Sequence, residues 1–137
     1  MILLDTCVLS EQLKPTPNPA CVNWLDSIPE DAVYIPVFAL GELKRGIERL
    51  EPGSKRNLLE IWLEQLNARF AGRIVDFDGQ AALIWGTLSA RLTASGTPMP
   101  LMDSLIAACA LRAGATLATR NVANFARAGV ELLNPWE

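Results

Sequence analysis

Short apolar runs alternate with longer mixed segments along this chain. The first run, Ile2–Leu4, is stopped by Asp5. Further short runs lie at 33–35, 74–75, 115–118 and 131–133. Runs of this length, separated by segments long enough to form helices, predict strands of a parallel sheet that is covered on both faces.

The segments between these runs carry helix signals. Asn18 followed by Pro19 is typical of a helix start, and Gly114 is typical of a helix end. Ser54 and Asp78 are expected N-caps of two further helices. The expected helices cover residues 5–13, 19–29, 37–50, 54–70, 78–94 and 101–113.

This succession predicts an α/β protein in which helices flank a central parallel sheet. A length of 137 residues suits one domain with one core. No internal repeat or linker interrupts the pattern, so a single domain is expected over residues 1–137. No apolar stretch reaches the ~20 residues that a membrane helix needs, and no signal-peptide pattern opens the chain, so a cytoplasmic protein is expected.

Charge and cysteine content narrow the function classes. The net charge of −3 argues against unaided binding to a polyanion. A basic cluster nevertheless lies within one stretch of the chain: Lys44, Arg45, Arg49, Lys55 and Arg56. Such a cluster is either a solvated face or a contact for nucleic acid or a partner. The odd number of cysteines, 3, without a CxxC spacing, indicates neither a disulfide framework nor a zinc knuckle.

Acidic residues at distant positions are expected to meet at one edge of the sheet. Asp5 follows the first strand, and active sites of open parallel sheets lie at the carboxyl ends of the strands. Glu42 lies near the start of the helix that follows the second strand, only ~7 Å below that edge at 1.5 Å rise per residue. Asp103 lies in the first turn of a helix that runs antiparallel to the strands. The run 115–118 then delivers Thr119, Arg120, Asn121 and Asn124 to the same region.

Each acid also has an ordinary explanation. Asp5 and Asp103 could be helix caps or could match a helix dipole, and Glu42 could pair with Arg45 or Arg49 at helical spacing. The convergence of all of them on one edge favours a divalent-metal site. Oxygen ligands select Mg²⁺ or Mn²⁺ over zinc, and such an ion suits phosphodiester hydrolysis. The absence of histidine excludes histidine-based ribonuclease and serine-triad chemistry, and no nucleotide-binding glycine motif occurs.

Five segments resemble the motifs of PIN-domain proteins, in particular the VapC/FitB-like toxins of type II toxin–antitoxin pairs. They are residues 1–10 with Asp5, 37–49 around Glu42, 102–108 around Asp103, 119–125, and the ending 132–137. The resemblance covers essentially the whole chain. Because the motifs are short, their order and spacing carry most of the specificity.

The resemblance implies a three-layer α/β/α fold with a central parallel sheet of about five strands and a Mg²⁺- or Mn²⁺-dependent endoribonuclease. It also implies a homodimer, inhibition by a cognate antitoxin protein, and operator DNA bound mostly through that antitoxin. Asp5, Glu42 and Asp103 match the metal-binding acids of the family. The family often has a further acid at the place held here by Asn121 or Asn124, which are therefore weaker ligand candidates. Cys7 stands directly after Asp5-Thr6, where the family commonly has a small polar residue.

The mechanistic hypothesis assigns Asp5 and Asp103 to one metal ion and Glu42 to a water molecule on that ion. In this hypothesis Thr6 and Thr119 form hydrogen bonds with water or phosphate; the alternative is that they merely cap helices. RNA phosphates would contact Arg45, Arg49, Lys55, Arg56 or Arg120.

Three rival functions stay open at this point. The first is a phosphoacceptor receiver-like module, although no lysine follows Lys55. The second is a catalytically weak or inactive PIN-fold partner protein, which Asn121 and Asn124 make plausible. The third is a metal-dependent DNA nuclease or phosphatase, since nothing in the sequence reads a 2′-hydroxyl.

Overall fold

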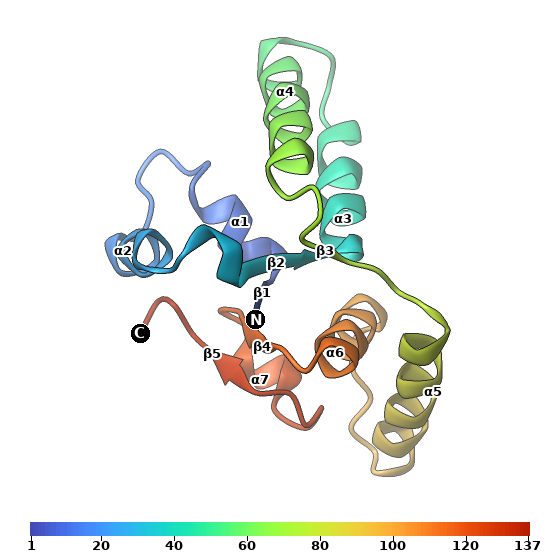
Figure 1. Ribbon diagram of the computed structural model, residues 1–137. Helices are drawn as coiled ribbons and strands as arrows, with labels where there is room; N and C mark the ends of the chain where they lie inside the picture. The colour runs from blue at the N-terminus through green and yellow to red at the C-terminus, as the bar shows by residue number, and fades with distance from the viewer.

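The computed structural model describes all residues from Met1 to Glu137 and has an α/β architecture (Figure 1). The strands are β1 (Ile2–Leu4), β2 (Val33–Pro36), β3 (Ile74–Val75), β4 (Thr116–Ala118) and β5 (Leu132–Leu133). The α-helices are α1 (Thr6–Glu11), α2 (Pro19–Ser27), α3 (Val37–Glu48), α4 (Ser54–Arg69), α5 (Gly79–Ala94), α6 (Leu101–Ala113) and α7 (Val122–Phe125), and a 3₁₀ turn spans Glu30–Ala32.

The sheet has 5 strands in the order β3-β2-β1-β4-β5, and every neighbouring pair is parallel. The first strand, β1, is central, so Asp5 emerges at the middle of the carboxyl edge. The polypeptide continues the ladder past this point, because the Asp5 amide donates to the Ala118 carbonyl at 3.0 Å. The predicted parallel sheet of about five strands is confirmed.

Alternating side chains of the strands build two cores, one on each face of the sheet. Leu3 and Leu117 face the core formed with α5, α6 and α7. Leu4 and Ala118, each one position later, face the core formed with α1, α2, α3 and α4. In Figure 1, α1 and α2 lie to the left of the strands and α3 and α4 above them, while α5 and α6 lie to their lower right, so helices cover both faces as expected.

Most predicted helix signals are confirmed. The Asn18 side chain accepts the Cys21 amide at 3.1 Å, and the Asp78 side chain accepts the Ala81 amide at 2.9 Å. Gly114 ends α6 with a left-handed φ of 63°, which favours glycine.

The prediction for Ser54 is wrong. Gly53 occupies the N-cap position of α4 and Ser54 is the first helical residue, with no side-chain capping bond. The short helix α7 was not expected either, because four residues carry too little periodicity to be recognised. No helix combines the length and the apolar composition that a membrane span requires.

Candidate functional site

Asp5 is a buried carboxylate that is held from several sides. It is 6 % exposed, at the junction of β1 and α1. Its Oδ1 accepts the backbone N–H of Thr6 at 2.8 Å, so Asp5 is also the N-cap of α1. Its Oδ2 accepts the hydroxyl of the buried Thr119 at 2.8 Å and the thiol of Cys7 at 3.6 Å. The two oxygens therefore have fixed directions at the edge of the sheet.

Glu42 lies in α3 and faces the start of α1. The Thr6 hydroxyl donates to its Oε1 at 2.8 Å. No ion pair joins Glu42 to Arg45 or Arg49, so the ordinary explanation as a helical salt bridge is wrong. Burial raises the pKa of Glu42, and the charges of Asp5 and Asp103 raise it further against the opposing Thr6 hydrogen bond.

Asp103 lies in the first turn of α6 and is half-buried. Its Oδ2 accepts the side-chain N–H of Asn124 at 3.1 Å. Burial raises its pKa, the Asn124 hydrogen bond lowers it, and the charge of Asp5 raises it. The charge of Asp5 acts on the pKa of both Glu42 and Asp103, and the charge of Asp103 acts on that of Glu42, which is consistent with carboxylates that face one region of the sheet edge.

No cation neutralises this group of acids. None of the salt bridges in the protein includes Asp5, Glu42 or Asp103. Half-buried carboxylates at close range favour either protonation or a bound cation. The donor set consists of oxygens, which fits a hard divalent ion rather than zinc.

The acids do not converge tightly enough to enclose an ion by themselves. No group of three or more Cys, Asp or Glu side chains is placed so that it could hold a metal ion directly. Mg²⁺ keeps several of its waters and commonly uses one or two carboxylates, so the arrangement fits an ion that is held partly through water.

The weaker ligand candidates behave differently from each other. Asn124 touches Asp103, as described. Asn121 makes a backbone contact only, in which its amide donates to the Thr119 hydroxyl at 3.0 Å. Asn124 is therefore the asparagine whose side chain is nearer to the acids.

Cys7 is a contact of the site that sequence reasoning treated only as a departure from the family pattern. Its sulfur lies 3.7 Å from the Thr119 hydroxyl and accepts the Arg120 amide at 3.5 Å. Burial and then the charge of Asp5 raise the pKa of the Cys7 thiol, so it stays protonated and donates to the carboxylate. Its position two residues after Asp5, at the start of a helix, was the available signal.

The predicted RNA-binding residues fall into two kinds. Arg45, Arg49, Lys55 and Arg120 are exposed and belong to no salt bridge. Arg56 instead contacts Glu48 at 2.6 Å, Glu60 at 3.0 Å and the Leu50 carbonyl at 3.2 Å. Arg56 therefore joins α3, α4 and the connection between them, and it is not a free cation.

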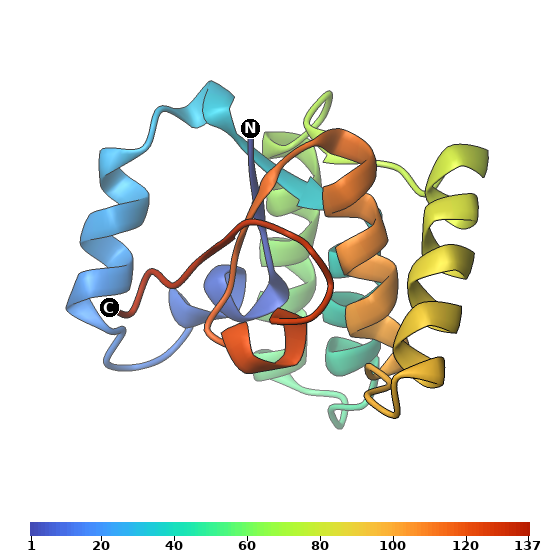
Figure 2. The ribbon, with the colours of Figure 1, turned by 90° about the horizontal axis from the view of Figure 1, so that it is seen from below.

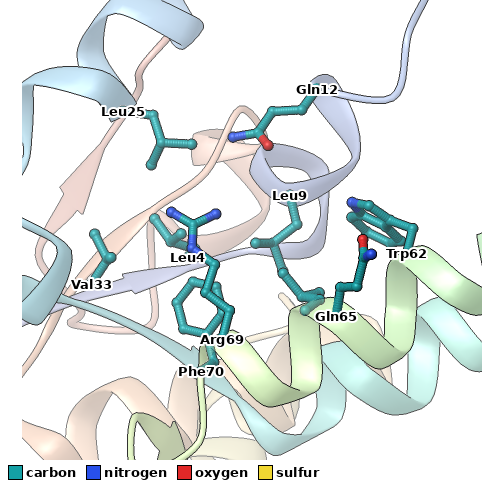
Figure 3. A pocket seen from close by; sticks show the side chains of 10 residues that line it. Leu4, Leu9, Gln12, Leu25, Val33, Trp62, Gln65, Arg69 and Phe70 are labelled. Carbon is teal, nitrogen blue, oxygen red and sulfur yellow. The ribbon is translucent and has the colours of Figure 1, made fainter.

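An apolar hollow of about 180 Å³ lies between α1, α2 and α4, away from the acids (Figure 3). Leu9 of α1, Leu25 of α2 and Trp62 of α4 line it together with Gln12 and Arg69. It contains no acid and therefore does not contribute to the carboxylate site.

Comparison with known proteins places this geometry in context. Residues 2–131 match the family described as the PIN domain. The chain is 41% identical to toxin FitB of Neisseria gonorrhoeae over 99% of both chains. It is 34% identical to VapC ribonuclease Y4jK of Sinorhizobium fredii, covering 100% of this chain and 99% of the relative.

Solved structures agree with the sequence comparison. A chain of the structure of FitAB bound to an IR36 DNA fragment superimposes with a TM-score of 0.94 at 39% identity, covering 100% of this chain and 96% of that one. A chain of VapBC2 from Rickettsia felis, bound to a DNA fragment from its promoter, gives a TM-score of 0.82 at 26% identity over 98% of both chains.

Proposed function

The chain belongs to the PIN-domain family, and we propose that it is a metal-dependent endoribonuclease, the toxin of a type II toxin–antitoxin pair. Its sequence similarity to toxin FitB, which extends over 99% of both chains, supports this proposal. In this proposal the PIN domain spans residues 1–137, and the protein acts on RNA in the cytoplasm. The observation that carries the chemistry is the group of uncompensated carboxylates of Asp5, Glu42 and Asp103 at the carboxyl edge of the sheet.

Asp5, Asp103 and Glu42 would hold the ion, which we propose to be Mg²⁺ or Mn²⁺. Bound there, it supplies a Lewis acid for the phosphodiester and for the attacking water. Of the two neutral ligand candidates, Asn124, whose side-chain N–H donates to Asp103, is the better placed, and Asn121, whose backbone amide donates to Thr119, is the weaker.

The side chains around the acids perform the remaining tasks. Thr119 and the Thr6 amide fix the direction of the Asp5 carboxylate. The Thr6 hydroxyl donates to Glu42 Oε1 at 2.8 Å and so orients this carboxylate toward the site. We assign Glu42 the role of general base toward the water that attacks phosphorus.

RNA phosphates are bound by the free cations. Arg45 lies one turn beyond Glu42 in α3, and Arg49 lies one turn beyond Arg45, so these side chains continue from the acids along one helix face. Lys55 and Arg120 are also exposed and without an ion pair, whereas the ion pairs of Arg56 make it the least suitable.

The proposed partner is an antitoxin protein, through which operator DNA is bound. The solved relatives FitAB and VapBC2 are complexes with DNA fragments.

A homodimer is also proposed. The exposed Leu58, Ile61, Leu83 and Leu101 provide apolar surface on α4, α5 and α6 for such contacts.

The test is cleavage of single-stranded RNA and of single-stranded DNA of the same sequence, with Mn²⁺ and with a chelator. We expect metal-dependent cleavage of RNA, and loss of it in Asp5→Asn and Asp103→Asn with unchanged circular dichroism. Cleavage of DNA alone would favour the DNA-nuclease alternative. Absence of any cleavage would favour an inactive partner protein, for which Asn121 and Asn124 provide the argument.

A further inference from the structure

Glu11 is a buried acid outside the proposed active site. It is 2 % exposed at the end of α1. Its Oε1 accepts Lys14 Nζ at 2.9 Å and Trp136 Nε1 at 3.2 Å, and its Oε2 accepts the Asn18 amide at 3.5 Å. Every contact fixes either the α1–α2 connection or Trp136. Figure 2 shows the C-terminal segment reaching this connection from β5.

Trp136 in turn positions a cation. The guanidinium carbon of Arg120 lies 5.5 Å from the centre of the Trp136 ring, within the range of a cation–π contact. Arg120 has no acidic partner. The Trp136 ring therefore contacts the Arg120 guanidinium without neutralising its charge.

The backbone of Arg120 is joined to the acid site. Its amide donates to Cys7 Sγ at 3.5 Å, and that sulfur lies 3.6 Å from Asp5 Oδ2. The preceding residue, Thr119, donates directly to Asp5. The backbone from which the Arg120 side chain extends is therefore fixed relative to Asp5.

A polar cavity of about 310 Å³ lies against Arg120 and Trp136. The lining includes Glu11, Lys14, Thr16 and Asn18. Lys14 and Glu11 offset each other, so Arg120 leaves one positive charge at this cavity in a protein of net charge −3. The helix α1 separates Glu11 from Asp5 by six residues, roughly 9 Å along its axis.

We propose that this cavity binds a nucleotide of the RNA strand close to the cleaved phosphodiester. Arg120 contacts its phosphate, and Trp136 and Glu11 are positioning residues that hold Arg120 in place. A cationic groove lined by an aromatic side chain is the usual means of binding a single strand. This inference rests on the proposed ribonuclease function.

A purely structural role would give a different result. If Glu11 and Trp136 only attached the C-terminal segment, their loss would lower the melting temperature without a selective effect on RNA affinity. The kinetic constants and their dependence on salt separate the two roles.

The experiment measures KM and kcat for a mixed-sequence single-stranded RNA with Mn²⁺ at several salt concentrations. Arg120→Gln is compared with Arg120→Lys, which keeps the charge, and with Arg91→Gln, a control on α5 whose guanidinium donates to the Arg127 carbonyl. Trp136→Phe, which keeps an aromatic face for Arg120, is compared with Trp136→Ala, and melting temperatures identify variants that fail to fold.

We expect Arg120→Gln to raise KM about tenfold with kcat within about twofold, as for one lost charge-assisted contact. The slope of log KM against log salt should fall by about 0.7, the value for one phosphate of a single strand. Arg120→Lys and Arg91→Gln should keep the parental slope, and Trp136→Phe should have a lower KM than Trp136→Ala.

If the parent cleaves RNA and Arg120→Gln has the parental KM and salt slope, the inference is overturned while the proposed function stands. If the parent does not cleave RNA, both fail. Equal KM values for Trp136→Phe, Trp136→Ala and the parent would overturn the positioning role of Trp136.

Discussion

Thr119 donates a hydrogen bond of 2.8 Å to Asp5 although 114 positions separate the two residues. The bond joins the ends of β1 and β4, which are neighbours in the sheet. Thr119 is fully buried and also accepts the Asn121 amide. One hydroxyl therefore links the central carboxylate to Asn121, the residue that precedes α7.

Thr119→Val should weaken both the fold and the site. Valine keeps the shape but leaves the Asp5 oxygen and the Asn121 amide without this partner, which costs about 1–3 kcal/mol. We expect the free energy of unfolding in urea to fall by this amount and Mn²⁺ affinity to fall as well. Thr119→Ser keeps the hydroxyl and is the matched control. Equal urea midpoints for valine and serine would show that the bond contributes nothing.

Glu42→Gln should stabilise the metal-free protein. The raised pKa means that the folded state binds the Glu42 proton more tightly than the unfolded chain does, so ionised Glu42 destabilises the fold near pH 7. Glutamine removes the charge and keeps an oxygen for the Thr6 hydroxyl. We expect the melting temperature in chelator to rise by about 2–4 °C. The exposed Glu64, which has no ion pair, provides the control Glu64→Gln, which should not change it.

Mn²⁺ should stabilise the parent more than it stabilises Glu42→Gln. The parent has one more carboxylate for the ion, so its melting temperature should rise more on addition of Mn²⁺ than that of Glu42→Gln. An equal rise in both proteins would exclude Glu42 from the metal site.

Asn124→Asp should place a fourth carboxylate beside Asp103. The Asn124 amide now donates to Asp103, and a carboxylate in its place would repel it. We expect a lower melting temperature in chelator, tighter Mn²⁺ binding, and a larger rise of the melting temperature on addition of Mn²⁺. Asn121→Asp is the comparison, since the Asn121 side chain makes no contact with the acids. If Asn121→Asp tightened Mn²⁺ binding more than Asn124→Asp, position 121 would be the natural place of a fourth ligand.

Glu30 should make stability depend on pH in the acid range. Hydrogen bonds from Arg69 and then Arg73 lower its pKa from 4.5 to about 2. A lowered carboxyl pKa stabilises the fold above the unfolded value, and this contribution disappears as the pH falls from about 4.5 to about 2. Because the ion pairs are exposed, Glu30→Gln should lower the melting temperature at pH 7 by only about 1–3 °C.

The difference in melting temperature between Glu30→Gln and the parent should shrink steadily over that pH interval. A difference that stays constant down to pH 2 would mean that packing, and not the ion pairs, is responsible.

The sequence pattern was sufficient for the strands and for the sheet edge at which Asp5 emerges. Strand ends at Asp5 and Thr119 follow from short apolar runs, and the parallel arrangement follows from the intervening helices. Local signals such as Asn18 before Pro19 also predict a boundary correctly, because the capping partner is three positions away. The prediction of Ser54 as an N-cap was wrong because Gly53 occupies that position, which glycine can do without a side-chain hydrogen bond.

Contacts between distant residues were beyond the reach of the pattern. Glu11 is the last residue of α1 and is followed by the exposed residues 12–16, so the sequence gives no sign that Trp136, 125 positions later, will contact it. Arg56 likewise differs from the other predicted RNA-binding residues because it forms ion pairs. These pairs depend on how the α3–α4 connection places Glu48 and Glu60 around it. Such pairings follow from the folded geometry alone.

Binding of Mn²⁺, followed by the electron paramagnetic resonance signal of the free ion, tests the central claim most directly. Titrations of the parent and of Asp103→Asn, with Glu64→Gln as control, would be compared at one pH and ionic strength. We predict that the parent and Glu64→Gln bind the ion with the same affinity and that Asp103→Asn binds it at least about tenfold more weakly. Equal affinity of Asp103→Asn and the parent would contradict the assignment of these carboxylates to a metal site.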